Sequence, residues 1–218
     1  MKYYFVLTFT PYLPTPLDPP YFKSALHMKL SRYKEKNIFC IEGNWGQGYE
    51  ESRSIRTALD FLNASVGISA IRKGCNNPEQ FNSYLKDSVK DSYDTFGIIY
   101  LAFHGSPGKL HINHHEKIDF TSIAATLQGK AKDKIIHFGS CSTLRLSGWD
   151  LRRFKKATGA LAISGYCKDI DFIESTVLDI LYFRKCQAYQ KVSLIHRDMQ
   201  LSYGKLVRQM GFKMLFEK

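Results

Sequence analysis

Short apolar runs recur along the chain and alternate with segments whose apolar residues have helical spacing. The runs end at glycine or polar turn residues, which is typical of buried strands. The most apolar run, FGIIYLAF, has a length that suits a central strand buried on both faces. The pattern predicts strands at residues 37–45, 68–73, 96–103, 134–139 and 160–164.

The segments between these runs have the apolar periodicity of helices. They predict helices at residues 50–64, 78–89, 121–127, 149–157, 172–189 and 193–210, with residues 109–119 forming a hairpin or loop. Because strands alternate with helices, the sequence predicts an α/β fold in which helices cover both faces of a mainly parallel sheet.

The first 36 residues are predicted to form a strand or ordered arm and then a basic amphipathic helix over 21–36. Five prolines between Pro11 and Pro20 exclude the interior of a sheet. The apolar opening is short and has no small-residue cleavage site, which argues against a signal peptide. No run reaches the roughly 18 apolar residues of a membrane span. We therefore expect a single domain over 1–218, with its core in 37–218, and no membrane partner.

The charge and the cysteine content indicate which binding partners and which cellular compartment to expect. The chain has 31 Lys and Arg against 20 Asp and Glu, a net charge of +11, with the densest basic clusters at 130–134 and 152–156. The scattered positive charge favours general solubility with some attraction for anions, and the absence of a nucleic-acid motif argues against nucleic acid as a partner. The basic surface could instead serve a small anionic regulator such as a nucleotide. Five cysteines without paired spacing favour a reducing, cytoplasmic environment.

Two of the predicted strands end in reactive residues. The run FGIIYLAF leads into His104 and Gly105, and KIIHFG leads through Ser140 into Cys141. The carboxyl ends of parallel strands lie at one edge of a sheet, where reactive groups of α/β proteins collect. Either residue alone suits an ordinary core position, but the pair at the ends of successive strands favours catalysis.

The chemistry of a thiol explains why this pairing matters. A thiol is mostly protonated at neutral pH and needs a nearby base, here His104, before Cys141 can act as a nucleophile. The N–H groups of Gly105 and Cys141 could both donate to a developing oxyanion. Gly105 also leaves space for a substrate backbone.

These residues resemble the caspase-like (clan CD) cysteine peptidases, which include caspases, metacaspases, gingipains, clostripain, separase and bacterial CHAT domains. The shared pattern is an apolar strand ending in His-Gly and a second ending in a small residue and Cys; this chain has LAFHG and IIHFGSC. The resemblance covers roughly residues 37–185 and implies a three-layer caspase-like fold, a His104–Cys141 dyad, and an oxyanion hole at Gly105 and Cys141. Cys141 lacks the Q-A-C-x-G signature of animal caspases, so we expect a bacterial branch without animal caspase specificity.

In this family the end of the first strand and the loop after the strand that follows the cysteine build the substrate pocket. The matching segments here, 42–45 and 165–171, contain no arginine. We therefore expect cleavage after Arg or Lys, with Asp169 as the main pocket residue. Asp169 or Asp171 could instead cap the helix that begins near Phe172. The expected substrate-binding residues are Glu42, Trp45, Asp169 and Asp171.

The predicted function is a cysteine endopeptidase that acts on a protein substrate without a cofactor or a metal. The resemblance also implies a bacterial defence effector, kept inactive until a nucleotide or protein partner reorders the loops 106–117 and 142–148. The alternative is a ligand-sensing module of the same fold without protease output. His111, His114 and His115 with Glu116 match no metal-site motif and are predicted to lie in a surface loop.

Overall fold

A six-stranded sheet lies at the centre of the structure, a computed structural model that describes residues 36–46 and 53–217. The chain divides into the units Met1–Arg32 and Tyr33–Lys218, and the described residues belong to the second. The expected N-terminal arm and the helix over 21–36 therefore lie outside the described residues, apart from Lys36. No helix among the described residues is both long and apolar enough to cross a membrane.

The strand order is β2-β1-β3-β7-β8-β9, and all neighbours are parallel except the β8–β9 pair. The side chains of β1, β3, β7 and β8 are all buried, as expected for strands covered on both faces. The predicted α/β fold with a mainly parallel sheet is confirmed. The strands are β1 (Ile38–Glu42), β2 (Ala70–Gly74), β3 (Ile98–Ala102), β7 (Ile135–Phe138), β8 (Ala162–Tyr166) and β9 (Phe212–Phe216).

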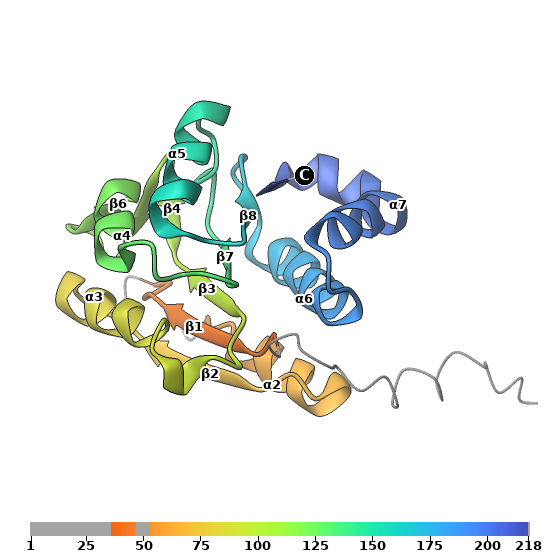
Figure 1. Ribbon diagram of the computed structural model, residues 1–218, viewed down its shortest axis with the longest axis horizontal. Helices are drawn as coiled ribbons and strands as arrows, with labels where there is room; N and C mark the ends of the chain where they lie inside the picture. Colours follow the sequence, from red (N-terminus) through yellow and green to blue (C-terminus); the bar gives the residue numbers. More distant parts are fainter. Residues whose placement is uncertain (1–35, 47–52, 218) are drawn as a thin grey trace, which may run out of the picture. The chain divides into compact units, whose positions relative to one another are not determined.

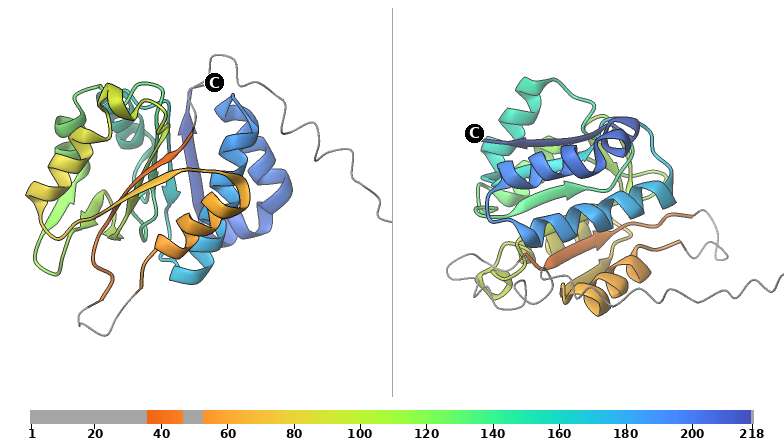
Figure 2. Two further views of the ribbon diagram at one scale, coloured as in Figure 1. Left: turned by 90° about the horizontal axis from the view of Figure 1, so that it is seen from below. Right: turned by 90° about the vertical axis from the view of Figure 1, so that its right-hand side faces the viewer.

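Helices cover both faces of the sheet, because alternate strand residues point to opposite sides (Figure 1). Ile38 and Ile98 belong to one apolar core, and Phe39 and Ile99 belong to the other. The first core packs against α2 (Arg56–Val66), α6 (Phe172–Ala188) and α7 (Val192–Met210). The second packs against α3 (Pro78–Asp87), α4 (Phe120–Leu127) and α5 (Gly148–Thr158). Figure 2 shows these helices on the two sides of the sheet.

A second, antiparallel sheet of three short strands follows β3 directly. It consists of β4 (His104–Ser106), β5 (Lys109–His111) and β6 (Lys117–Asp119). The hairpin predicted over 109–119 is confirmed, because β5 and β6 pair antiparallel with Lys109 opposite Asp119. The range 106–117, which the sequence predicted to be a loop, contains the paired strand β5. Leu110 and Ile118 are buried beneath this sheet, which explains why the excursion is ordered.

The strand β9 was missed by the sequence analysis. Helix α7 ends at Gly211, whose φ of 62° is the left-handed conformation that terminates a helix and favours glycine. The following residues pair antiparallel with β8 from Phe212↔Tyr166 to Phe216↔Ala162. The five residues are too few for a clear periodicity, and only their pairing partner defines them as a strand.

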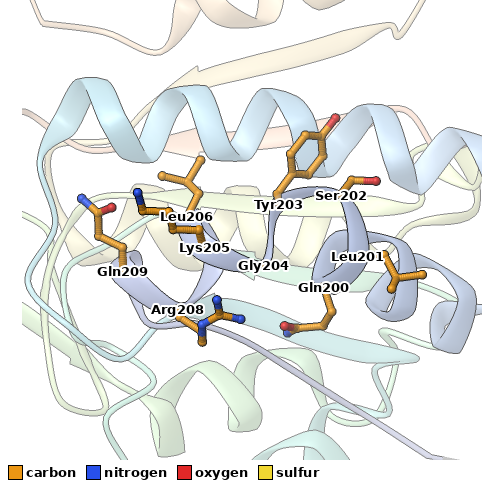
Figure 3. Close-up of a pocket in the computed structure, with 9 residues that line it drawn as sticks. All are labelled: Gln200, Leu201, Ser202, Tyr203, Gly204, Lys205, Leu206, Arg208 and Gln209. Carbon is orange, nitrogen blue, oxygen red and sulfur yellow. The ribbon is translucent and has the colours of Figure 1, made fainter.

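Helix α7 is interrupted at Tyr203, whose backbone angles (φ −132°, ψ 21°) are not helical. Residues around this kink line a surface cavity of about 620 Å³; they are Gln200 to Leu206, Arg208 and Gln209 (Figure 3). None of the residues predicted to form the functional site lines this cavity.

Candidate functional site

The strands β3 and β7 end side by side and bring the two candidate catalytic segments to one edge of the sheet. They pair in parallel, with Leu101 opposite Phe138, and the N–H of Gly139 donates to the carbonyl of Leu101 at 3.0 Å. A Cβ on Gly139 would lie 2.4 Å from the Tyr100 ring, so only glycine fits between the strand and the cysteine loop.

Gly105 packs directly against the loop that carries Cys141. A Cβ on Gly105 would lie 2.8 Å from the carbonyl oxygen of Cys141 and 2.3 Å from Oγ1 of Thr143. Thr143 donates its hydroxyl to that same Cys141 carbonyl at 3.2 Å, which fixes the loop. The structure therefore packs Gly105, the residue that follows His104, against the loop of Cys141.

His104 is exposed and anchored through one ring nitrogen. Its Nε2 lies 3.0 Å from the carbonyl oxygen of Trp45, and the two rings meet edge to face at 5.3 Å. A carbonyl can only accept a hydrogen bond, so this contact places the proton on Nε2. In the neutral imidazole the other nitrogen, Nδ1, is then a free proton acceptor.

Cys141 is half-buried, and its Sγ donates to the carbonyl oxygen of Ile170 at 3.6 Å. Among the described residues, no acceptor receives the backbone N–H of Cys141. Burial raises the pKa of Cys75 to about 11 and that of Cys186 to about 12 and also raises the pKa of Cys40, which keeps these thiols protonated. The half-buried thiols are Cys141 and Cys167.

Glu42 does not offer a free carboxylate to a substrate, contrary to its predicted role. It is 1% exposed and pairs with the guanidinium of Arg72. One of its oxygens accepts from the indole N–H of Trp45 at 2.7 Å and from the backbone N–H of Ile55 at 2.8 Å. The other accepts from the hydroxyl of Ser54 at 3.0 Å. Since both oxygens are occupied, Glu42 acts as a support for Trp45.

Trp45 links this buried carboxylate to the candidate base. Its indole packs edge to face on the His104 ring, with centroids 5.3 Å apart, and on the Phe172 ring, with centroids 5.1 Å apart. Its backbone carbonyl accepts a hydrogen bond from Nε2 of His104. Trp45 therefore orients His104 through two contacts. Its contact with a substrate stays a prediction.

The two aspartates of the loop after β8 have different environments. Asp171 is the N-cap of α6 and accepts from the N–H groups of Ile173 at 2.8 Å and Glu174 at 3.0 Å. Asp169 is exposed and accepts from the hydroxyl of Ser142, the residue after the candidate nucleophile, at 2.7 Å. In the described part of the chain no cation pairs with Asp169. The structure thus places Asp169 beside Cys141 and gives Asp171 a capping role.

The neighbouring Lys168 does not neutralise Asp169, because its ammonium group donates to the carbonyls of Arg208 and Gln209 at 3.0 and 3.2 Å. Its backbone carbonyl accepts from the N–H of Ser142 at 2.7 Å, which ties the two loops together. Ser142 has a φ of 45°, a conformation that few residues other than glycine adopt, and this backbone contact holds it there.

A buried polar network lies beneath the site and was missed by the sequence analysis. Asp179 of α6 accepts from Tyr100 Oη at 2.7 Å and from Tyr166, and contacts Nε2 of His137 at 2.8 Å. The other His137 nitrogen meets the hydroxyl of Ser164 at 2.9 Å. Burial, and then the Asp179 charge, raise the pKa of both tyrosines. The network joins β3, β7 and β8 to α6. The signal in the sequence that could have revealed it is a histidine, His137, within the otherwise apolar run KIIHFG.

Comparisons with known proteins agree with this architecture. No curated protein matches the chain. The crystal structure of caspase-1 from Spodoptera frugiperda superposes with a TM-score of 0.50 and 8% sequence identity, covering 84% of this chain and 87% of that chain. At this identity the likeness concerns the fold alone, and it confirms the three-layer caspase-like fold. A family model matches residues 35–216, and the chain belongs to that family, a family of unknown function (DUF6642).

Proposed function

We propose that this protein is a cysteine endopeptidase in which Cys141 is the nucleophile and His104 is the general base. The observation that carries the proposal is the contact of Gly105 with the Cys141 loop, combined with the Trp45 carbonyl that leaves Nδ1 of His104 free to accept a proton. Two reactive side chains at the carboxyl edge of a parallel sheet fit this role, and the caspase-like fold is compatible with it.

The reaction would follow from these groups. Nδ1 of His104 takes the proton from Sγ of Cys141, and the thiolate attacks the carbonyl carbon of the scissile peptide bond. The N–H groups of Gly105 and Cys141 would donate to the resulting oxyanion. The C–N bond then breaks as His104 returns the proton to the leaving amine. Water, deprotonated by His104, hydrolyses the thioester and releases the carboxylic acid product and the free thiol.

The proposed specificity is for Arg or Lys immediately before the scissile bond, in a protein substrate. Asp169 supports this specificity, because its carboxylate is exposed and pairs with no cation of the described chain. It accepts a hydrogen bond from Ser142, the residue that follows the proposed nucleophile. A cationic side chain would form a charge-assisted hydrogen bond there, whereas an acidic one would meet like charge. Glu42 no longer belongs to this pocket.

We further propose that the enzyme belongs to a bacterial caspase-like branch and serves as a defence effector that a nucleotide or a protein partner activates. The net charge of +11 favours an anionic activator. The alternative function, a ligand-sensing module of the same fold, is favoured by a lysine-lined cavity at the opposite edge of the sheet. Peptide cleavage distinguishes these two functions.

The test is cleavage of fluorogenic peptides that differ only in the residue before the scissile bond. We expect Cys141→Ala and His104→Ala each to abolish cleavage after Arg and Lys, because members of one catalytic unit fail together. Cys167→Ala is the matched control, since it removes the other half-buried thiol. If Cys167→Ala lost activity while Cys141→Ala kept it, the nucleophile would be misassigned; preference for Asp would refute the specificity.

A further inference from the structure

A cavity lies at the amino ends of β7 and β8, the opposite edge of the sheet from Cys141. Its volume is about 560 Å³, within the range typical of small-molecule sites. Its walls come from four segments: the residues before β7, the stretch from the last turn of α5 to the residue before β8, the α6–α7 turn, and the end of β9. Segments distant in sequence thus build one cavity that the candidate active site does not use.

Lysine side chains dominate the charge of this cavity. The four that line it are Lys132, Lys155, Lys156 and Lys191, against Asp133 and Glu217. Lys155 pairs with Glu217 at 2.9 Å. Within residues 36–46 and 53–217, the other three lysines form no ion pair. Lys132 belongs to the basic cluster at 130–134, and Lys155 and Lys156 belong to the one at 152–156.

The helix dipole accounts for only part of this charge. Lys155 and Lys156 lie in the last turn of α5, where cations stabilise a helix end. Lys132 comes from the loop before β7, and Lys191 is the N-cap residue of α7, the helix end at which the dipole disfavours a cation. Converging like charges repel one another, so their arrangement around a cavity favours an anion between them.

The amino end of α7 adds hydrogen-bond donors to the same cavity. Its N-cap residue, Lys191, forms no side-chain capping bond, and α7 is 19 residues long. Across the described chain, the backbone N–H groups of Val192 and Ser193 donate to no acceptor, and both residues line the cavity. Unsatisfied N–H groups at a helix amino end, together with unpaired lysines, are the features of a phosphate site.

One wall of the cavity is apolar. Leu161, which is 39% exposed, lines it together with Phe216 and Ala160. An exposed leucine beside an aromatic ring offers a surface for a flat ring system. The cavity thus combines a cationic part with an apolar part.

We propose that this cavity binds a polyphosphorylated small molecule that carries a ring, of the nucleoside polyphosphate class. The phosphates would contact the lysines and the amino end of α7, and the ring would pack on Leu161 and Phe216. Binding here does not depend on the protease activity of Cys141, because the site uses no residue of the catalytic edge.

Isothermal titration of the full chain tests this site, with ATP, tripolyphosphate and adenosine as probes at physiological salt. We expect ATP to bind more tightly than tripolyphosphate, and adenosine to bind least. Lys156→Glu and Lys191→Glu should each weaken ATP binding about tenfold or more, since a charge-assisted contact becomes a repulsion. Lys86→Glu is the control, because Lys86 is exposed in the last turn of α3, as Lys156 is in α5.

Several results would overturn the proposal. The first is that the wild type does not bind ATP. The second is that both charge-reversed variants bind ATP as tightly as the wild type while keeping the wild-type circular dichroism spectrum. The third is that adenosine binds as tightly as ATP. Tripolyphosphate binding as tightly as ATP would refute the ring contact. Cys141→Ala should bind ATP like the wild type, so failure of the protease proposal leaves this result unchanged.

Discussion

Individual side chains near the candidate site have separate roles that their shared charge conceals. Glu42 and Asp169 are both acidic and belong to segments expected to contact a substrate. Glu42 is buried and saturated by four donors, whereas Asp169 is exposed and accepts a single hydrogen bond from Ser142. Burial and pairing, rather than charge alone, decide which carboxylate remains available for a cationic ligand.

Asp169→Asn is expected to lower kcat/KM for Arg and Lys substrates by about 10- to 100-fold, because it removes the charge but keeps the acceptor for Ser142. Asp171→Ala should instead cost about 1 kcal/mol of stability by removing the cap of α6. Peptide kinetics and thermal unfolding measured on both variants separate the roles. Exchanged effects would mean that the assignments of the two aspartates are reversed.

Glu42→Gln is expected to lower kcat/KM about tenfold or more on basic and neutral substrates alike, since it would loosen Trp45 and misplace His104. The new amide N–H₂ would also face a donor, costing about 1–3 kcal/mol of stability. Kinetics with paired peptides check this. A loss confined to basic peptides would show that Glu42 contacts the substrate after all.

At the scale of elements, α6 and α7 are joined by an ion pair that the structure partly shields from water. Lys185 of α6 lies 2.8 Å from Asp198 of α7, which also accepts from Ser202 and Tyr189. The hydrogen bonds from Lys185 and Ser202 lower the pKa of Asp198 from 3.8 to about 2. This stabilisation is fully present above pH 3.8 and is lost as the pH falls toward 2.

Asp198→Asn should therefore destabilise the protein at pH 7 by about 1 kcal/mol, a value reduced for solvent screening of a partly exposed pair. The difference from the wild type should shrink as the pH falls from 4 to 2. Urea unfolding at a series of pH values measures it. Asp60→Asn, at an exposed position of α2, is the control and should show no such trend. A constant difference across this pH range would contradict the role of the ion pair.

Across the whole described chain, the network around Asp179 connects the sheet to the helix layer. Tyr100, His137 and Tyr166 from three neighbouring strands converge on one carboxylate of α6. The strands that they occupy lead to His104, Cys141 and Asp169. The relative position of the three site segments thus depends on a buried polar centre below them.

Asp179→Asn should lower the free energy of unfolding by about 1–3 kcal/mol, because an amide N–H₂ would oppose one of the donors in a buried position. Chemical denaturation should show a lower midpoint with an unchanged slope, the sign of reduced stability without a change in compactness. Asp60→Asn again serves as the control. An unchanged midpoint would show that the network contributes no net stability.

The amino-acid sequence by itself determined the layers of the fold and the candidate dyad. Runs such as FGIIYLAF are too apolar to lie anywhere except between two covering layers, and strands that alternate with helices pair in parallel. Because parallel strands have their carboxyl ends at the same edge of a sheet, His104 and Cys141 could be predicted to lie at that edge. Asp171 could be expected to cap a helix from its place just before Phe172.

Only the tertiary structure decided what depends on partners from distant segments. Glu42 lost its predicted role because Arg72, Ser54 and Ile55 approach it from elsewhere in the chain. The strand β9 exists because β8 lies beside it. The lysine cavity forms because four separate segments meet at the amino edge of the sheet. Periodicity records which side of an element is apolar, but pairing and charge compensation arise from contacts between residues far apart in sequence.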